Sequence, residues 1–269
     1  MMIYELTQSE FERTRPFFHP LAAYLPFCAA VLAGAQLGRI WVDDPAQPRT
    51  GFMLTRDVWS YLAGSPQNQA FNEALLQAIL TREIVTERAI GLLLCCTREW
   101  EGALTAVFPQ QPIPYERRRY LCRSFQNRWR DELPDGFRLQ PIDASLQALS
   151  NVPEDVQSML AQGSPEDDPL QKGFGFVVLR EHQIAAHAVV DCIVDGIGDI
   201  GLVTEEPYRR SGLATAVSAA AVEFGLSNGL QAINWDCDAQ NEGSVRTAEK
   251  LGFQLDRTHV MHFVSFGNL

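Results

Sequence analysis

The sequence predicts an α/β (α+β) protein in which a mixed, mostly antiparallel sheet carries helices on both faces. The chain has 269 residues, of which 46% are hydrophobic and 20% charged, so it can bury a substantial core and suits two domains better than one. Its carboxyl half reads as strand, helix, three strands, helix, strand, helix and a final strand. That order packs helices against a mixed sheet.

The first strong feature of the amino half is an apolar run over residues 17–35. We expect a buried helix that begins near Pro26 and ends at Gly38. A signal or membrane anchor is the alternative, but Pro20 and Pro26 interrupt the run and acidic residues outnumber basic ones before it. The expectation is therefore a protein that does not enter a membrane.

The rest of the amino half alternates between strand and helix patterns. GRIWVDDPAQPRTGFMLT (38–55) predicts a hairpin around a Pro-rich turn, FNEALLQAILTREI (71–84) a helix, and AIGLLLCCT (89–97) a buried strand. The basic stretch 115–133 predicts an amphipathic connecting helix. The turn LPDGF (133–137) marks the expected boundary between an amino-terminal domain, 1–132, and a carboxyl-terminal domain, 137–269.

The carboxyl half gives each element of its order in turn. Strands are expected at FRLQPID (137–143), on either side of the turn REHQ (180–183), at GDIGLVT (198–204), at AINWDCDAQN (232–241) and at HVMHFVSF (259–266). Helices are expected within 144–163, at 211–229 and at 244–252, the last two closed by Gly229 and Gly252.

Charge separates the two halves. Residues 1–136 carry 15 acidic and 14 basic side chains, net −1, whereas residues 137–269 carry 18 and 8, net −10. An acidic field repels nucleic acid phosphate and attracts cations, so we expect no nucleic acid partner and favour a cationic amine. Ordinary acidity of a cytosolic protein would explain the same charge. A protein that binds nucleic acid through the arginines from Arg117 to Arg130 is an alternative function.

The six cysteines are scattered without paired spacing, and no His, Asp and Glu residues have metal-ligand spacing. We therefore expect reduced thiols in a cytoplasmic protein and no bound metal.

The stretch TEEPYRRSGLATAV (204–217) joins a strand to a helix of small residues through two arginines and a glycine. The free N–H groups and the dipole of a helix amino end favour an anion there, and small side chains at Gly212 and Ala214 let it approach the backbone. Positive charge at Arg209 and Arg210 is unfavourable in an isolated helix but favourable beside a bound diphosphate. No Walker loop or G-x-G-x-x-G turn is present.

The segment RRSGLA (209–214) resembles the R/Q-x-x-G-x-G/A coenzyme A motif of the GNAT acetyltransferase superfamily. NEGS (241–244) and EKLGF (249–253) resemble two further segments of that family, and the likeness covers 137–269. It implies a GNAT-like carboxyl domain that binds the cofactor, and we expect the smaller α/β amino domain to shape the acceptor side. The amino half resembles a bacterial subgroup that includes zwittermicin-resistance-type acetyltransferases, could be a degenerate copy of the fold, and lacks the motif.

The resemblance implies an acetyl-CoA-dependent N-acetyltransferase that moves an acetyl group directly to an amine of a small molecule or peptide, with acetyl-CoA as cosubstrate. It implies that the strand ending at residue 204 contacts pantetheine and the thioester. The start of the helix that follows this strand would bind the pyrophosphate, and residues of the segment 241–244 would contact pantetheine and the thiol arm. The residues are Leu202, Val203 and Thr204; Arg209, Arg210, Ser211, Gly212, Leu213, Ala214 and Thr215; and Asn241 and Ser244.

The amine must lose a proton, and acidic residues are the first candidates. Alternation along the strand at 232–241 separates Ile233, Trp235 and Cys237 from Asp236. Asp236 occupies the place where some family members carry an acidic base, and it is the first candidate. Asp191 is the second, and a water chain remains an alternative.

The proton donor to the departing thiolate is unassigned. Many family members carry a tyrosine seven residues after the asparagine, and here that residue is Ala248. Tyr208, Ser244 or water could serve, and an acyl-enzyme on Cys237 is disfavoured because its side chain is expected on the packed face. A non-catalytic acyl-CoA-binding module is therefore the alternative function, and a homodimer stays open.

Overall fold

The computed structural model describes residues 3–55, 58–125, 129, 133–161 and 169–268. The chain divides into two compact units, unit 1 with residues 1–116 and 259–269, and unit 2 with residues 117–258. These bounds differ from the expected domains 1–132 and 137–269. Unit 2 begins at residue 117 and not at 137, and residues 259–269 belong to unit 1.

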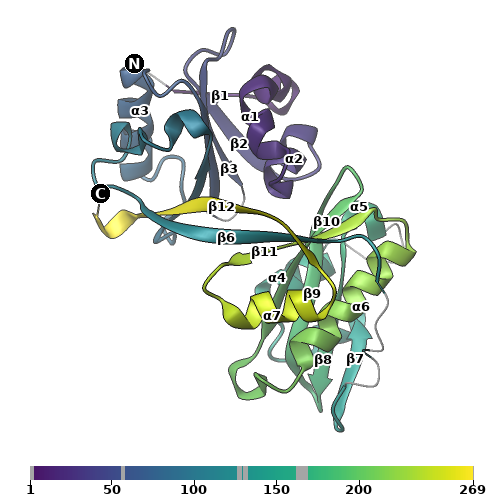
Figure 1. Ribbon diagram of the computed structural model, residues 1–269. Coiled ribbons are helices and arrows are strands. Elements are labelled where there is room, and N and C mark those ends of the chain that lie inside the picture. Colours follow the sequence, from purple (N-terminus) through teal and green to yellow (C-terminus); the bar gives the residue numbers. More distant parts are fainter. Residues whose placement is uncertain (1–2, 56–57, 126–128, 130–132, 162–168, 269) are drawn as a thin grey trace. The chain divides into compact units, whose positions relative to one another are not determined.

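Unit 1 contains six neighbouring strands of the sheet, with helices on both faces (Figure 1). Helices α1 and α2 pack on one face with the core residues Ile40, Met53 and Tyr61, and α3 packs on the other with Trp41, Phe52 and Leu62. The strand order is β1-β2-β3-β4-β5-β12, in which only the β4–β5 pair is parallel among the pairings described. The elements are β1 (Tyr4–Glu5), α1 (Arg15–Ala22), α2 (Pro26–Ala33), β2 (Gly38–Val42), β3 (Thr50–Thr55), β4 (Trp59–Gly64), α3 (Gln69–Leu80), β5 (Gly91–Cys96) and β12 (Gln254–Ser265), of which residues from 259 onward belong to this unit.

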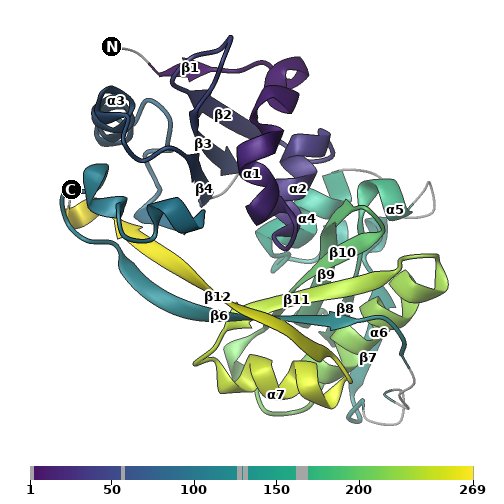
Figure 2. The same cartoon turned by 45° about the horizontal axis from the view of Figure 1, so that its top comes forward.

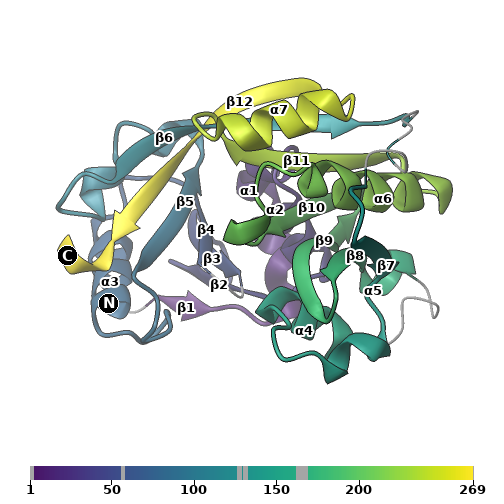
Figure 3. The ribbon, with the colours of Figure 1, turned by 90° about the horizontal axis from the view of Figure 1, so that it is seen from below.

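Unit 2 repeats this plan, with the strand order β7-β8-β9-β10-β11-β6 (Figure 2). Its one parallel pair among the described pairings is β10–β11, joined by α6. Helix α6 packs on one face of the sheet and α4 on the other, as Figure 3 shows from below. The elements are β6 (Ile113–Cys122), β7 (Phe137–Pro141), α4 (Glu154–Ala161), α5 (Pro169–Lys172), β8 (Phe174–Arg180), β9 (Gln183–Val194), β10 (Ile197–Thr204), α6 (Leu213–Ser227), β11 (Ala232–Asp238) and α7 (Glu242–Lys250).

Each sheet is completed by a strand from the other half of the sequence. Residues 117–122 of β6 pair with β11 in unit 2, and residues 262–265 of β12 pair with β5 in unit 1. Backbone donors along β11 and β5 would otherwise lie at an open sheet edge. The two last strands are therefore exchanged between the halves of the chain.

Most expected elements are confirmed, and two expectations are wrong. The basic stretch forms the strand β6 over residues 113–122 and not a helix. By strand alternation, Arg117 and Arg119 lie on the face opposite Tyr120, where they bond to residues of β11 and β12. Residues 126–128 and 130–132 of that stretch lie outside the described residues. Helix α2 ends at Ala33 and not at Gly38, since Gly34 takes a left-handed conformation with φ of 72°.

Strand β4 was not expected, because Ser60, Ala63 and Gly64 have low strand propensity. None of the helices in the described ranges combines the length and apolar character needed to cross a bilayer.

Candidate functional site

The site begins where two parallel strands part. Strands β10 and β11 are paired over three positions, Ile197–Asp199 against Ala232–Asn234. Beyond them, β10 continues to Thr204 and stays paired with β9, while β11 continues to Asp238 and stays paired with β6. The facing edges of β10 and β11 are therefore unpaired past Asp199, and backbone N–H and C=O groups there are available to a ligand.

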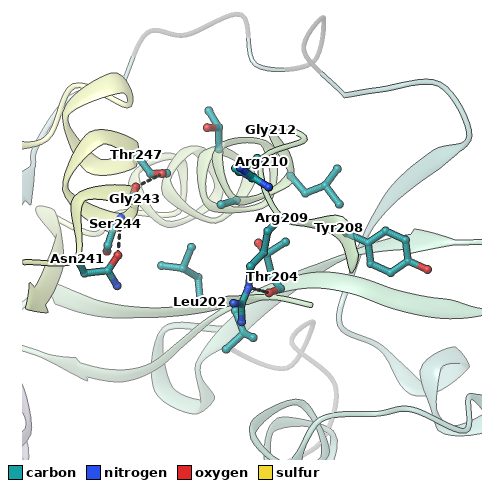
Figure 4. Close-up of a pocket in the computed structure, with 14 residues that line it drawn as sticks. Leu202, Thr204, Tyr208, Arg209, Arg210, Gly212, Asn241, Gly243, Ser244 and Thr247 are labelled. Carbon is teal, nitrogen blue, oxygen red and sulfur yellow. Dashed lines mark hydrogen bonds between the residues drawn. The ribbon is translucent and has the colours of Figure 1, made fainter. Parts of the chain in front are cut away.

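A cavity of about 670 Å³ opens beside these free edges and the amino ends of α6 and α7 (Figure 4). Its lining comprises Leu202, Val203, Thr204, Tyr208, Arg209, Arg210, Gly212, Leu213, Ala214, Thr215, Asn241, Gly243, Ser244 and Thr247. The structure thus brings together eleven of the twelve residues expected to contact acetyl-CoA. The twelfth, Ser211, does not line the cavity, and its hydroxyl donates to the carbonyl of Tyr208.

The amino end of α6 is open. Its N-cap is Gly212, and no side chain in the described part of the protein caps the helix. The first-turn N–H groups therefore keep their capacity to bind an anion, and the helix dipole adds positive potential. By contrast, Asn68 caps α3 through the amide of Phe71, and Asn241 caps α7 through the amide of Ser244.

The turn before α6 has an unusual backbone. Arg210 has φ of 62° and Gly212 has φ of 83°, both in the left-handed region. For a non-glycine residue this conformation costs on the order of 1–2 kcal/mol, and such strain concentrates at binding sites. Turns that hold residues in the left-handed region can direct backbone N–H groups inward, a geometry that binds anions. Residues 209–214 contain two such residues after an extended Arg209, and this segment is named the phosphate-binding turn.

Both arginines of the phosphate-binding turn are exposed. Arg209 donates through Nε to the carbonyl of Thr204 at 3.3 Å, and neither guanidinium forms an ion pair with a carboxylate of the described chain. Their charges are thus uncompensated by protein at the mouth of the cavity, which favours an anionic ligand.

Three lining residues were not among the expected contacts: Tyr208, Gly243 and Thr247. Thr247 lies one helical turn after Ser244, and its hydroxyl donates to the carbonyl of Gly243 at 2.8 Å. The i, i+3 spacing from Ser244 could have found it. Tyr208 packs edge-on against Phe137 and donates to Gln183 at 3.3 Å, a tertiary arrangement with no local signal.

The residues near Ser244 divide between cavity and core. The Ser244 hydroxyl accepts from the indole of Trp235 at 3.0 Å, while Ala248 is fully buried in the core of unit 2. Cys237 is also buried in that core, as its strand alternation predicted, and burial raises the pKa of its thiol. A thiolate nucleophile is disfavoured there.

The two expected proton acceptors lie outside the cavity lining. Asp236 is on β11, where its carboxylate accepts from Nε of Arg117 and its carbonyl from Nη2 at 2.9 Å. Only 14% of the Asp236 side chain is exposed. Asp191 is partly exposed on β9. Both act electrostatically on a third carboxyl, Asp199.

The carboxyl of Asp199 has a strongly raised pKa. Burial, opposed by the hydrogen bond from Asn234 and reinforced by the charges of Asp236 and Asp191, raises its pKa to about 7. Sequence reasoning did not single it out, because the cause is the packing of three strands.

Three histidines, at 187, 259 and 262, lie outside the cavity lining. His187 is 1% exposed, and its Nε2 lies 2.7 Å from a carboxylate oxygen of Asp155. His259 contacts the ring of Tyr24 edge-on, and burial lowers the pKa of His262. In the described ranges, no three His, Cys, Asp or Glu side chains are grouped to hold a metal ion.

Comparison with known proteins gives a consistent result. A family model described as GNAT acetyltransferase matches residues 24–261. An uncharacterized N-acetyltransferase of Bacillus subtilis, YdfB, is 24% identical over 97% of this chain and 98% of its own length. A mycothiol acetyltransferase of Nocardiopsis dassonvillei is 28% identical over 49% of this chain and 47% of its own.

Among solved structures, a GCN5-related N-acetyltransferase-like protein from Streptococcus suis superimposes with a TM-score of 0.70 at 22% identity, covering 96% of this chain and 98% of that one. The mixed sheet with helices on both faces is thus the fold of that protein. The likeness to zwittermicin-resistance-type proteins stays a prediction.

Proposed function

The chain belongs to the GNAT acetyltransferase family and is an acetyltransferase, and we propose that it transfers an acetyl group from acetyl-CoA directly to an amine of a small molecule or peptide. The observation that carries this proposal is the open amino end of α6. There the phosphate-binding turn joins a helix end without a side-chain cap, two arginines that form no ion pair within the described residues, and a cavity of about 670 Å³.

The residues present fit coenzyme A by their chemistry. First-turn amides of α6, with the guanidinium groups of Arg209 and Arg210, would hold the diphosphate. The unpaired edge of β10 from Leu202 to Thr204 offers backbone groups to the amides of pantetheine, and Asn241 and Ser244 line the opposite wall. When bound, acetyl-CoA supplies an activated thioester carbonyl. A strand N–H directed at that carbonyl would stabilise the charge that develops on its oxygen.

The acceptor follows from charge. Residues 137–269 carry a net charge of −10, and Asp191, Asp199 and Asp236 gather where β10 and β11 part. We propose a cationic amine, which this field would attract and which must lose a proton before attack. In the cytoplasm, where we place the protein, the six cysteines, all free in the structure, would stay reduced. A homodimer and the role of unit 1 stay predictions.

Two measurements test the function. Calorimetric titration with acetyl-CoA should show binding, and an assay of free thiol should show release of coenzyme A with at least one member of a panel of amines. Binding without thiol release from any amine would instead favour a non-catalytic acyl-CoA-binding module, the alternative suggested by Ala248. Absence of acetyl-CoA binding would contradict both.

A further inference from the structure

Asp199 lies at the point where β10 and β11 part. It is the last residue of β10 that is paired with β11, opposite Asn234, and the strand edge that lines the cavity begins three residues later at Leu202. Asp199 does not itself line the cavity, but it lies where the opening between the two strands closes. Its side chain is partly buried.

The side chain of Asp199 lies on the sheet face opposite α6. Ile233 and Trp235 of β11 belong to the core beneath α6, and Asn234, which alternates with them, points the other way and donates to the Asp199 carboxylate. The carboxylate therefore lies on the face that α6 and the phosphate-binding turn do not occupy.

Asn234 is held in the orientation that makes it a donor to Asp199. Its Oδ1 accepts from Nε of Arg119 at 2.6 Å, which leaves the Nδ2 group for Asp199. Arg119 is fixed in turn by an ion pair with Asp256 at 2.6 Å. The Asp199 carboxylate is therefore positioned by a chain of contacts that runs from β12 through β6 and β11.

The charges around Asp199 distinguish it from its neighbours. Asp191 and Cys192 of β9 and Asp236 of β11 flank it, and Arg117 of β6 is a cation whose charge acts on it and lowers its pKa. Arg117 forms its ion pair with Asp236. Asp236 is thus engaged with a guanidinium, whereas the one hydrogen bond that Asp199 shows in the described structure comes from a neutral amide.

We propose that Asp199 is the proton acceptor of acetyl transfer and that Asp236 positions Arg117. This assignment rests on the proposed function. An ammonium acceptor gives one proton to the Asp199 carboxylate, and the nitrogen lone pair then forms the C–N bond to the thioester carbon. The C–S bond breaks with its electron pair passing to sulfur, which takes the second proton from nitrogen. Asp199 releases its proton to water, so one proton leaves per acetyl group transferred.

A pKa of about 7 suits this task, since a general base works best near the pH at which the enzyme operates. Below that pH, Asp199 is increasingly protonated, and kcat should fall about tenfold for each pH unit. Above it, kcat should level.

The test compares the pH dependence of kcat in the wild type and four full-length variants, from pH 5.5 to 9, by thiol release with saturating acetyl-CoA and a saturating amine. Asp199→Asn keeps an oxygen acceptor for Asn234 and removes the base, while Asp199→Glu restores a carboxylate. Asp236→Asn tests the competing assignment. Asp195→Asn, in the exposed β9–β10 turn, is the matched control. Titration with acetyl-CoA and circular dichroism verify that each variant is folded.

We expect Asp199→Asn to bind acetyl-CoA with unchanged affinity, to lose about a hundredfold or more of kcat at pH 7, and to show no break near that pH. Asp199→Glu should regain at least tenfold of the loss. A wild-type pH profile in Asp199→Asn, or loss of the break in Asp236→Asn alone, would overturn the assignment and leave the proposed function standing. A wild-type protein that acetylates no amine would overturn both.

Discussion

Asp199→Asn should also make the protein more stable, and increasingly so as the pH rises. The carboxyl of Asp199 has an ordinary pKa of 3.8 in an unfolded chain and a pKa of about 7 in the folded protein, where burial disfavours its charge. The folded state therefore holds this proton more tightly, so its stabilising contribution is present below pH 3.8 and is lost as the pH rises through 7. Asparagine stays neutral throughout and keeps the hydrogen bond from Asn234.

The difference in pKa sets an upper limit of about 4 kcal/mol for the loss of unfolding free energy over the whole pH range. About 2 kcal/mol of this loss falls between pH 5.5 and 8. Because the Asp199 side chain is partly exposed, water reduces this figure, and we expect about 1 kcal/mol over that range. For a chain of this size the corresponding change in Tm is about 2–4 °C.

The assay is thermal unfolding without ligand, for wild type and variant at several pH values from 5.5 to 8.5. The Tm difference between Asp199→Asn and wild type should grow in favour of the variant up to about pH 7.5 and then level. Asp195→Asn should show a constant difference. A Tm difference for Asp199→Asn that does not change with pH, or that shrinks as pH rises, would refute a buried, tightly protonated Asp199.

Three further predictions concern the cavity and the exchanged strands. Gly212→Glu should abolish acetyl-CoA binding in calorimetry, because it places a carboxylate at the open end of α6. Gly229→Glu, also at a left-handed glycine but beyond the other end of that helix, should bind normally, and equal affinities of the two variants would remove the phosphate-binding turn from the site. Asn241→Asp should keep the cap on α7 and hence the Tm, but should weaken acetyl-CoA binding. Asn241→Ala should weaken binding and also lower the free energy of unfolding in urea by about 1 kcal/mol, and an unchanged affinity in both variants would argue against contact with the ligand. A fragment of residues 137–269 should not fold alone, because β11 loses β6, and co-expression with residues 1–136 should restore soluble protein; a fragment that is monomeric and cooperatively folded would contradict this.

The sequence was sufficient for the parts of the fold that rest on local patterns. The turns at Gly229 and Gly252, the alternation that separates Cys237 from Asp236, and the small residues at the start of α6 each follow from neighbouring residues, and the structure agrees with them. The expected acetyl-CoA contacts came from the resemblance of the motifs to the GNAT family and not from local patterns, and eleven of the twelve line one cavity.

Non-local effects account for what the sequence did not predict. The run of arginines at 117–119 has helical propensity, but pairing with β11 and the partners Asp236 and Asp256, more than a hundred residues away, stabilise the strand β6. Likewise, no local pattern distinguishes Asp199 from Asp191 or Asp236. Its raised pKa depends on strands β9, β10 and β11 lying side by side.

The repeated plan of the two units explains why one site, and not two, is expected. In unit 1 the parallel pair β4–β5 is joined by α3, as β10–β11 is joined by α6 in unit 2, so a second anion site would lie at the amino end of α3. That end is closed by Asn68, whose amide also donates to Asp43 at 2.9 Å.

The polar cavity beside it, about 530 Å³, is lined by the carboxylates of Asp43 and Asp44 together with one arginine, Arg49. A diphosphate placed there would meet two negative charges and a helix end already occupied by a side chain. The difference between the units thus lies in a few side chains at one equivalent turn. We therefore expect acetyl-CoA to bind with a stoichiometry of one per chain, and a calorimetric stoichiometry of two would show that the α3 end can open.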